Sequence, residues 1–279
     1  MKKQILTIGL ALLLILSMAS CAPKQAADEL KSRFEDYTVD SNIAVILDAS
    51  TFYFADHTLR LDDICENEEL NNGYLFLEGK LYFTTAKKEG AFAYSLLVYV
   101  CDLHGNQKHL VFEKHGYKTK PWAVGNRDTM FIEHYTTNAL DDSSRVIDSY
   151  NVVTCVYQTE ESGKDENLSD YQKNKHGDYS CSYEDGVYSV VNHQGKITYT
   201  IDAVSLVRSE FAKELNGFDL TPGGFFATDD GKMYLLYRIA ADGTQYPYLV
   251  CEYLPADNTI RFVFLCFADD VETIDMEYF

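Results

Sequence analysis

A short motif, a turn followed by a strand-like run, recurs along the chain and constrains its fold more than any other feature. Residues 78–83 read Glu-Gly-Lys-Leu-Tyr-Phe, and residues 230–235 read Asp-Gly-Lys-Met-Tyr-Leu. Residues 185–188 carry a shorter version, and residues 126–131 carry a degenerate version without the glycine. The copies recur roughly every 50 residues, and each is followed by a second pair of apolar runs. The pattern predicts successive units of four short antiparallel strands.

The composition supports strands along the whole chain. Aromatic residues make up 14% of the 279 residues, with 21 Tyr and 16 Phe, and aromatic side chains are enriched in strands. Hydrophobic residues make up 46%, which is enough for a sizeable core. We therefore expect one β-rich domain over residues 34–279.

One short helix is predicted near residues 209–216. Ser209 is a residue type that caps helix starts, and Gly217 follows the expected end. The apolar residues Phe211 and Leu215 would share one face and pack against the core.

The recurring motif resembles the blades of β-propeller lipoproteins with degenerate Gly-Lys-Leu-Tyr repeats. This resemblance implies about five four-stranded blades in a ring. Strands near residues 43–47 and 51–54 would complete the ring together with the C-terminal segment. Two alternatives remain open from the sequence, a β-sandwich and an open set of antiparallel sheets.

The N-terminus predicts export and a lipid anchor. A mostly apolar run over residues 5–16 follows Lys2 and Lys3, and it is too short for a membrane span, which needs about 20 residues. It fits the apolar part of a signal peptide, which needs roughly 7–15. The next residues, Met18-Ala19-Ser20-Cys21, resemble the lipobox of bacterial lipoproteins.

The lipobox resemblance implies a specific processing and location. Residues 1–20 would be a signal peptide that is removed, and the Cys21 thiol would carry a diacylglycerol as the lipidation site. Residues 21–33, which are mostly polar or small, would be the anchor and tether. We expect the mature chain on the extracytoplasmic face of the cell membrane, held by its acyl chains.

The charge of the chain excludes one class of partner. The formal net charge is −19, whereas nucleic-acid binding needs Lys and Arg to displace counterions. We therefore expect no nucleic-acid partner. An acidic surface is also repelled by anionic lipid headgroups, so contact with the membrane is expected through the lipid anchor.

Six cysteines follow Cys21, and none has the C-x-x-C spacing of a metal site. Cys101, Cys155, Cys251 and Cys266 lie in strand-like text, where a free thiol behaves as a small buried hydrophobe. We expect most of these four to be buried and reduced. Disulfides remain open in an exported chain, and Cys251 with Cys266 is the pair that neighbouring strands would allow.

The search for chemistry finds few candidates. The chain has no H-E-x-x-H, G-x-S-x-G, S-x-x-K or P-loop motif, so we assign no catalytic residue, no metal site and no cofactor. Trp122, the only tryptophan, is either a core residue between blades or a platform on which a ligand stacks. Asp62 and Asp63 lie on an acidic loop and join Trp122 as candidate binding residues. His104, His109 and His115 are close in sequence, and the first two flank one turn, but zinc needs three or four ligands in fixed geometry, so all three are expected to be exposed.

Two functions follow from these observations. The first is a membrane-tethered, extracytoplasmic, non-enzymatic module that binds or scaffolds a protein or glycan partner. The second is a carbohydrate-active hydrolase that uses two paired carboxylates on a propeller. The first is favoured because the motifs of the sequence are structural, and fold alone does not decide function.

Overall fold

The computed structural model describes the chain over these residues: 26–37, 42–65, 68–138, 144–160, 168, 179–194, 196–228, 230–240, 245–269 and 274–278. The predicted signal peptide, the predicted lipobox with Cys21 and the first residues of the predicted tether lie outside the described residues. The chain divides into two compact units. Unit 1 is Met1–Ser41 with Tyr179–Glu272, and unit 2 is Asn42–Asp178 with Thr273–Phe279.

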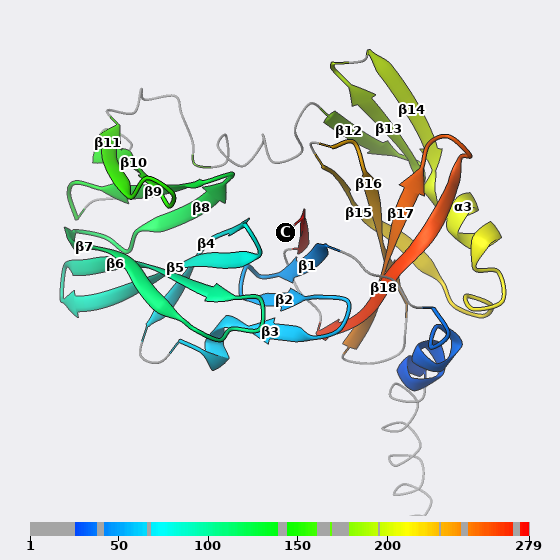
Figure 1. Cartoon of the computed structure of the whole chain (residues 1–279), viewed down its shortest axis with the longest axis horizontal. Helices are drawn as coiled ribbons and strands as arrows, with labels where there is room; N and C mark the ends of the chain where they lie inside the picture. The colour runs from blue at the N-terminus through cyan, green and yellow to red at the C-terminus, as the bar shows by residue number, and fades with distance from the viewer. Residues whose placement is uncertain are drawn as a thin grey trace, which may run out of the picture. The chain divides into compact units, whose positions relative to one another are not determined.

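Unit 2 holds three antiparallel sheets of four strands each (Figure 1). The first has the order β19-β1-β2-β3, made of β19 (Ile274–Tyr278), β1 (Ile43–Leu47), β2 (Thr51–Tyr53) and β3 (Thr58–Arg60). The second has the order of β4 (Glu69–Leu77), β5 (Lys80–Gly90), β6 (Ala93–Asp102) and β7 (His109–Tyr117). The third has the order of β11 (Val156–Glu160), β10 (Arg145–Asn151), β9 (Thr129–Tyr135) and β8 (Trp122–Asn126).

Unit 1 holds two further antiparallel sheets and two short helices. The three-stranded sheet has the order of β12 (Tyr179–Glu184), β13 (Val187–Asn192) and β14 (Ile197–Asp202). The four-stranded sheet has the order of β15 (Leu220–Ala227), β16 (Met233–Ile239), β17 (Gln245–Leu254) and β18 (Thr259–Asp269). The helices are α3 (Ala203–Glu210) and a segment over residues 26–33. None of the helices in the described residues combines the length and apolar content that a membrane crossing requires.

The fold class predicted from the sequence is confirmed at the level of an all-β protein built from antiparallel sheets. Each of the five sheets is open, with two edge strands, as the alternative of open antiparallel sheets expects. Four sheets have four strands, as predicted. The sheet β12–β14 has three strands in the described residues, so the prediction of four strands per unit is wrong there.

The recurring motif marks the same turn in four sheets. Gly79 lies between β4 and β5, Asp128 between β8 and β9, Gly186 between β12 and β13, and Gly231 between β15 and β16. These are the turns between the first and second strands of successive sheets, so the motif predicted equivalent positions correctly. The two-residue turns at Gly79 and Gly186 share positive φ at both residues. Glu78 and Gly79 have φ of 52° and 70°, and Asp185 and Gly186 have φ of 49° and 88°. Positive φ at both residues is typical of the two-residue turns that match strand twist.

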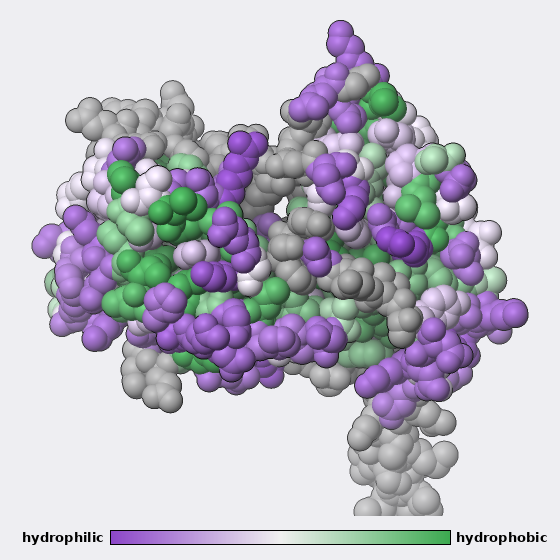
Figure 2. Space-filling model, viewed as in Figure 1, coloured by the Kyte–Doolittle hydropathy of each residue, from purple (hydrophilic) through white to green (hydrophobic). Residues whose placement is uncertain are grey.

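The cores of the units follow from which strands are central. β1 is buried along its whole length because it lies between β19 and β2, and its continuous apolar sequence fits that place. In unit 2, β4 and β8 approach closely: a Cβ atom on Gly125 would overlap the carbonyl group of Tyr74. On the face seen in Figure 2, hydrophilic residues cover much of the surface, and hydrophobic residues gather over the region of β5–β7.

The predicted helix is displaced toward the N-terminus. The structure has α3 at Ala203–Glu210, capped by the Asp202 carboxylate, which accepts a hydrogen bond from the Ser205 backbone N–H at 3.0 Å. Residues 211–217 form turns instead. The prediction of 209–216 is therefore wrong in position, because Asp202 caps the helix before Ser209 is reached. Phe211 and Leu215 are buried, as expected.

Ordered structure also begins before residue 34. Residues 26–33, which the sequence analysis assigns to the tether, form a helix whose Leu30 is fully buried in the core of unit 1. The Phe34 ring stacks on Phe262 with centroids 5.2 Å apart. The Arg33 guanidinium donates to the backbone carbonyls of Glu214 and Asn216 at 2.8 and 2.9 Å. This segment is too short for its apolar pattern to predict a helix. Packing of its apolar side chains against the core stabilises the helix.

The cysteines after Cys21 are all free thiols. Cys101, Cys251 and Cys266 are buried, as predicted, and burial raises the pKa of the Cys101 thiol to about 12. The prediction that most of the four are buried and reduced is therefore confirmed, and Cys155, which is exposed, is the exception. It lies in the turn between β10 and β11 with φ of 56°, where the Asn151 side chain accepts hydrogen bonds from the turn's backbone. Cys251 faces Phe262 in the register of β17 and β18, so it is not opposite Cys266.

Candidate functional site

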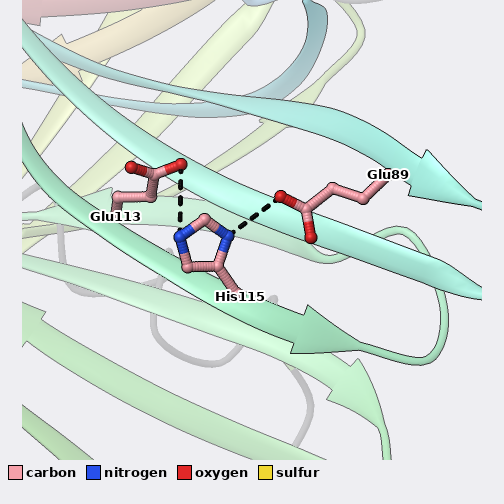
Figure 3. A group of neighbouring side chains, drawn as sticks. All are labelled: Glu89, Glu113 and His115. Atoms are coloured by element: carbon pink, nitrogen blue, oxygen red, sulfur yellow. Dashed lines mark hydrogen bonds and ion pairs between the residues drawn. The ribbon is translucent and has the colours of Figure 1, made fainter.

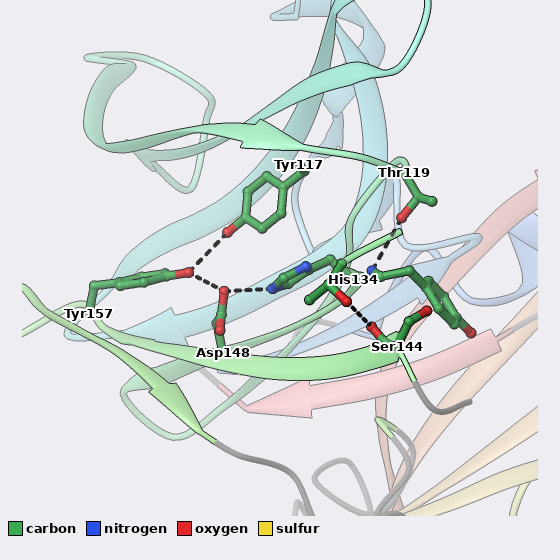
Figure 4. A network of polar contacts seen from close by, with 8 residues as sticks. Tyr117, Thr119, His134, Ser144, Asp148 and Tyr157 are labelled. Atoms are coloured by element: carbon green, nitrogen blue, oxygen red, sulfur yellow. Dashed lines mark hydrogen bonds and ion pairs between the residues drawn. The ribbon is translucent and has the colours of Figure 1, made fainter. Parts of the chain in front are cut away.

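A buried polar network lies inside the third sheet of unit 2 (Figure 4). Asp148 on β10 is its centre and is 1% exposed. The Asp148 Oδ2 atom lies 3.0 Å from His134 Nε2 on β9 and accepts a hydrogen bond from the Tyr157 hydroxyl on β11. The Tyr157 hydroxyl lies 3.4 Å from the hydroxyl of Tyr117, at the end of β7. One carboxylate therefore joins three strands of a sheet, and a tyrosine pair extends the network to a neighbouring sheet.

The network keeps its carboxylate charged. Burial by itself would raise the pKa of Asp148, but hydrogen bonds from His134 and Tyr157 outweigh burial, and the pKa of Asp148 lies below its ordinary value. Burial and the hydrogen bond to Asp148 raise the pKa of Tyr157 to about 12. Tyr157 therefore remains a donor at neutral pH. A buried carboxylate with committed donors is typical of a structural network.

The arrangement of His134 and Asp148 has the geometry by which a carboxylate orients a catalytic imidazole. Such an imidazole activates a nucleophile that is hydrogen-bonded to its other nitrogen. In the described ranges no Ser, Thr or Cys side chain is hydrogen-bonded to His134, and the ring packs edge-on against Tyr117 at 4.7 Å. We therefore assign the network a role in holding β7, β9, β10 and β11 together.

A second group of chemically active side chains lies at the surface of the sheet β4–β7 (Figure 3). The His115 ring lies between two carboxylates: Nδ1 is 2.9 Å from Glu89 Oε1, and Nε2 is 3.5 Å from Glu113 Oε1. All three residues are exposed, and one ligand atom from each lies within 4.8 Å of the others. Hydrogen bonds from Ser95 and His115 lower the pKa of Glu89. We call Glu89, Glu113 and His115 the surface triad.

The sequence analysis missed the surface triad and expected no metal site. It considered His104 and His109 together, because they flank one turn. The structure instead places His104 against His57, with ring centroids 4.0 Å apart. The signal available in the sequence was the pair Glu113 and His115, which are two apart on one strand and so point to one face. Glu89 comes from another strand, and no local pattern links it to them.

The candidate binding residues lie on separate elements. Trp122, on β8, is 45% exposed, so the core position that the sequence allowed is not adopted. The Lys120 ammonium lies 5.5 Å from the centre of its ring. Asp62 and Asp63 are exposed on the short 3-10 turn η1 (Leu61–Asp63) after β3. No hydrogen bond or ion pair in the described residues joins the two aspartates to Trp122, and a shared binding role stays a prediction.

Several acidic residues in other acidic segments of the chain lie outside the described residues, namely Glu66, Asp141, Asp142, Asp270 and Glu272. Among the described residues, the surface triad and Trp122 are the groups from which we weigh a binding role against a hydrolase with paired carboxylates.

Comparisons with known proteins give no family. No protein-family model and no curated protein matches the chain. Among solved structures, 26 chains match. One is MPT-1, described as a GDP-Man-dependent mannosyltransferase from Leishmania mexicana, with 14% identity and a TM-score of 0.25 over 84% of this chain and 76% of that chain. Another is a hypothetical protein from Leishmania major, with 13% identity and a TM-score of 0.25 over 84% and 75%. Likeness at this TM-score supports no argument about function.

Proposed function

We propose that this chain is a lipid-anchored, extracytoplasmic, non-enzymatic binding module whose sheets are β-propeller-like blades. The partner is a protein or a glycan of the cell envelope. The proposal has three supports, which are the order of the sheets, the lipobox and the exposure of Trp122.

The order of strands in the sheets supports propeller-like blades. Each sheet is a run of strands consecutive in the chain, except that β19 joins the first sheet beside β1. A first sheet completed by the last strand of the chain is the arrangement that joins the two ends of a ring of blades. Blades of a propeller also converge at their inner strands, and the contact of β4 with β8 at Gly125 is a close approach of that kind.

The lipobox supports the location. Met18-Ala19-Ser20-Cys21 follows an apolar run of signal-peptide length, and a diacyl anchor provides the two chains that stable membrane attachment needs. The extracytoplasmic location follows from export. An acidic chain, with a net charge of −19, would then contact the membrane through its anchor and present its domain to the envelope.

The exposure of Trp122 is the observation that carries the binding function. Tryptophan is large and apolar, and it is enriched at interfaces. Its ring on β8 is partly open to solvent, and the Lys120 ammonium beside it is paired with Glu69 at 2.9 Å. An exposed aromatic face of this kind is suited to stack on a sugar ring or an aromatic side chain.

Trp122 also provides the test, because it is the only tryptophan in the chain and so the sole source of tryptophan fluorescence. Titration with solubilised peptidoglycan and teichoic or lipopolysaccharide glycans should quench or blue-shift its emission in a saturable way for one of them. A pull-down from native membranes covers protein partners, and Trp122→Ala should lose the partner that the parent captures.

The matched control is Tyr183→Ala, since Tyr183 is exposed to a similar degree, 48% against 45%, and lies on β12. The proposal is contradicted if Trp122→Ala captures every partner of the parent protein with equal yield and no glycan changes the emission of Trp122.

The alternative, a carbohydrate-active hydrolase, requires two carboxylates on either side of a space for the glycosidic bond. One carboxylate oxygen of Glu89 and one of Glu113 lie within 4.8 Å of each other, which is closer than the roughly 5–5.5 Å of retaining enzymes. The His115 ring fills the space between them, as Figure 3 shows, so this pair does not favour the hydrolase.

A further inference from the structure

We propose that the surface triad of Glu89, Glu113 and His115 is a binding site for a divalent transition-metal ion, with zinc as the reference ion. An imidazole and two carboxylates are ligand types that zinc accepts, at about 2.0–2.2 Å. Ligand atoms around a tetrahedral ion of that size are roughly 3.4 Å apart. His115 Nε2 lies 3.5 Å from Glu113, which is the spacing of two ligands of one ion, whereas Glu89 faces the other ring nitrogen, Nδ1, at 2.9 Å. One ligand atom from each of the three residues lies within 4.8 Å of the others, so the exposed Glu89 side chain would turn toward Nε2 to complete the site.

Two backbone irregularities bring these residues together. The register of β5 with β6 skips Glu89, between the pairs Lys88↔Tyr94 and Gly90↔Ala93. In the register of β6 with β7, the single residue Ser95 on β6 stands opposite two residues on β7, His115 and Gly116. A β-bulge of this type redirects a side chain, and bulges are frequent beside functional sites. Here one bulge places Glu89 opposite the step from Ala93 to Tyr94, the other places His115 opposite Ser95, and each redirects one ligand.

Gly116 shows that the second bulge is specified by the sequence. Its φ is +89°, a conformation that glycine adopts at little cost and that other residues avoid. The glycine directly follows His115, and so fixes the backbone at the point where the imidazole leaves the strand.

Ser95 orients the imidazole from below. It is fully buried, and its Oγ atom lies 2.7 Å from His115 Nδ1. When Ser95 Oγ accepts the Nδ1 proton, Nε2 keeps its lone pair and faces Glu113. In a metal-bound histidine, the N–H of the second ring nitrogen characteristically donates a hydrogen bond to a fixed oxygen in this way. Ser95 also donates a hydrogen bond to Glu89, which contributes to the lowered pKa of that carboxyl group.

The local charge favours a cation. Glu89 and Glu113 contribute two negative charges, which one dication would balance. Lys114 lies between Glu113 and His115 in sequence, but its ammonium is 4.9 Å from the centre of the Tyr157 ring and so lies away from the triad. The charge of Lys87 is the smallest of the effects that lower the pKa of Glu89. The net charge of the chain, −19, also raises the local concentration of cations.

The test is a calorimetric titration of the full chain, purified in detergent without a polyhistidine tag, with zinc chloride in a metal-free buffer. We expect one saturable site. His115→Ala should weaken its affinity at least tenfold, and Glu89→Gln and Glu113→Gln should each weaken it by roughly the same order. Ser95→Ala should also weaken it, because the imidazole loses its orienting oxygen. His109→Ala is the matched control, since His109 is exposed on the same strand and should bind zinc like the parent.

Three results would overturn the proposal. One is the absence of saturable zinc binding, which would leave His115 as a hydrogen-bonding imidazole between two glutamates. The second is a His115→Ala variant that binds zinc as tightly as the parent. The third is loss of the site in His57→Ala with His115→Ala unaffected, which would assign the ion to the contact of His57 with His104. Circular dichroism of each variant separates loss of binding from loss of fold.

Discussion

His134 and His115 both lie on strands of unit 2 beside carboxylates, and their surroundings are opposite. His134 bonds to Asp148, whose side chain is 2% exposed, whereas the His115 side chain is 60% exposed between Glu89 and Glu113. The buried carboxylate has hydrogen-bond donors from two neighbouring strands, so removing it would leave those donors unpaired in the interior. The exposed group is hydrated whether or not its members pair, so it adds little to stability. The same residue types thus hold the fold in one place and remain available to a ligand in the other.

The largest expected effect is on the buried side of this comparison. Asp148→Ala removes the buried carboxylate and leaves the partly buried side chains of His134 and Tyr157 without this acceptor. Breaking a buried pair in this way costs about 3–5 kcal/mol, measured by urea unfolding followed by far-ultraviolet circular dichroism. Asp62→Ala, at an exposed aspartate of the same unit, should change the free energy of unfolding by at most about 0.5 kcal/mol. Equal midpoints for the two variants would show that the network does not hold the sheet.

The pH dependence of stability gives a second measure of the same network. The pKa of Asp148 is lowered in the folded chain, so its contribution is fully present above the ordinary aspartate value of about 3.9. That contribution is lost as the pH falls from the ordinary value through the lowered pKa, because over this range the unfolded state binds a proton that the folded carboxylate does not. The stability difference between the parent and Asp148→Asn should therefore shrink from pH 7 to pH 3. A difference that stays constant over this range would contradict the charged network.

Thiol labelling extends the contrast between interior and surface to the whole chain. Cys155 and Cys181 are exposed, whereas Cys101, Cys251 and Cys266 are buried. Iodoacetamide should label the first two in the native protein, and the buried three should react only after unfolding. Mass spectrometry without reductant should find all six labelled in guanidinium chloride. Recovery of intact disulfides, or native labelling of Cys251, would contradict the assigned burial.

The parts of the fold that local sequence determines were predicted from it. The turns at Gly79 and Gly186 could be predicted because a positive φ at two successive residues favours a glycine in the second place. Alternating strand text and aromatic content predicted the all-β class. Cys155 was misplaced because its flanking residues are strand-like, while the turn there depends on the Asn151 side chain.

The helix and the sites show why the rest was not predicted. Two capping residues, Asp202 and Ser209, compete to start a helix, and the earlier one is used. Four residues spaced four apart are all buried, namely Ala203, Val207, Phe211 and Leu215. The apolar face of the helix therefore begins before Ser209. The surface triad and the buried network each combine residues from different strands, and the register that brings them together is a tertiary property.

The smallest expected effect is on the exposed side of the comparison. His115→Ala should leave the midpoint of urea unfolding within error of the parent in metal-free buffer, because the triad is hydrated in both states. Added zinc should raise the unfolding midpoint of the parent and leave that of His115→Ala unchanged. An ion that binds only the folded state stabilises that state. Destabilisation of His115→Ala comparable to that of Asp148→Ala would remove the distinction between the two histidines.

The anchor is the central claim of the proposed function, and Cys21→Ala tests it most directly. The parent, expressed with its own N-terminus, should sediment with membranes, partition into the detergent phase and incorporate labelled palmitate. Cys21→Ala should lose the label and either leave the membrane fraction or accumulate as a larger, unprocessed precursor. Ser20→Ala keeps a small residue beside the cysteine and should behave like the parent. A Cys21→Ala protein that sediments, partitions and migrates like the parent would contradict the lipid anchor.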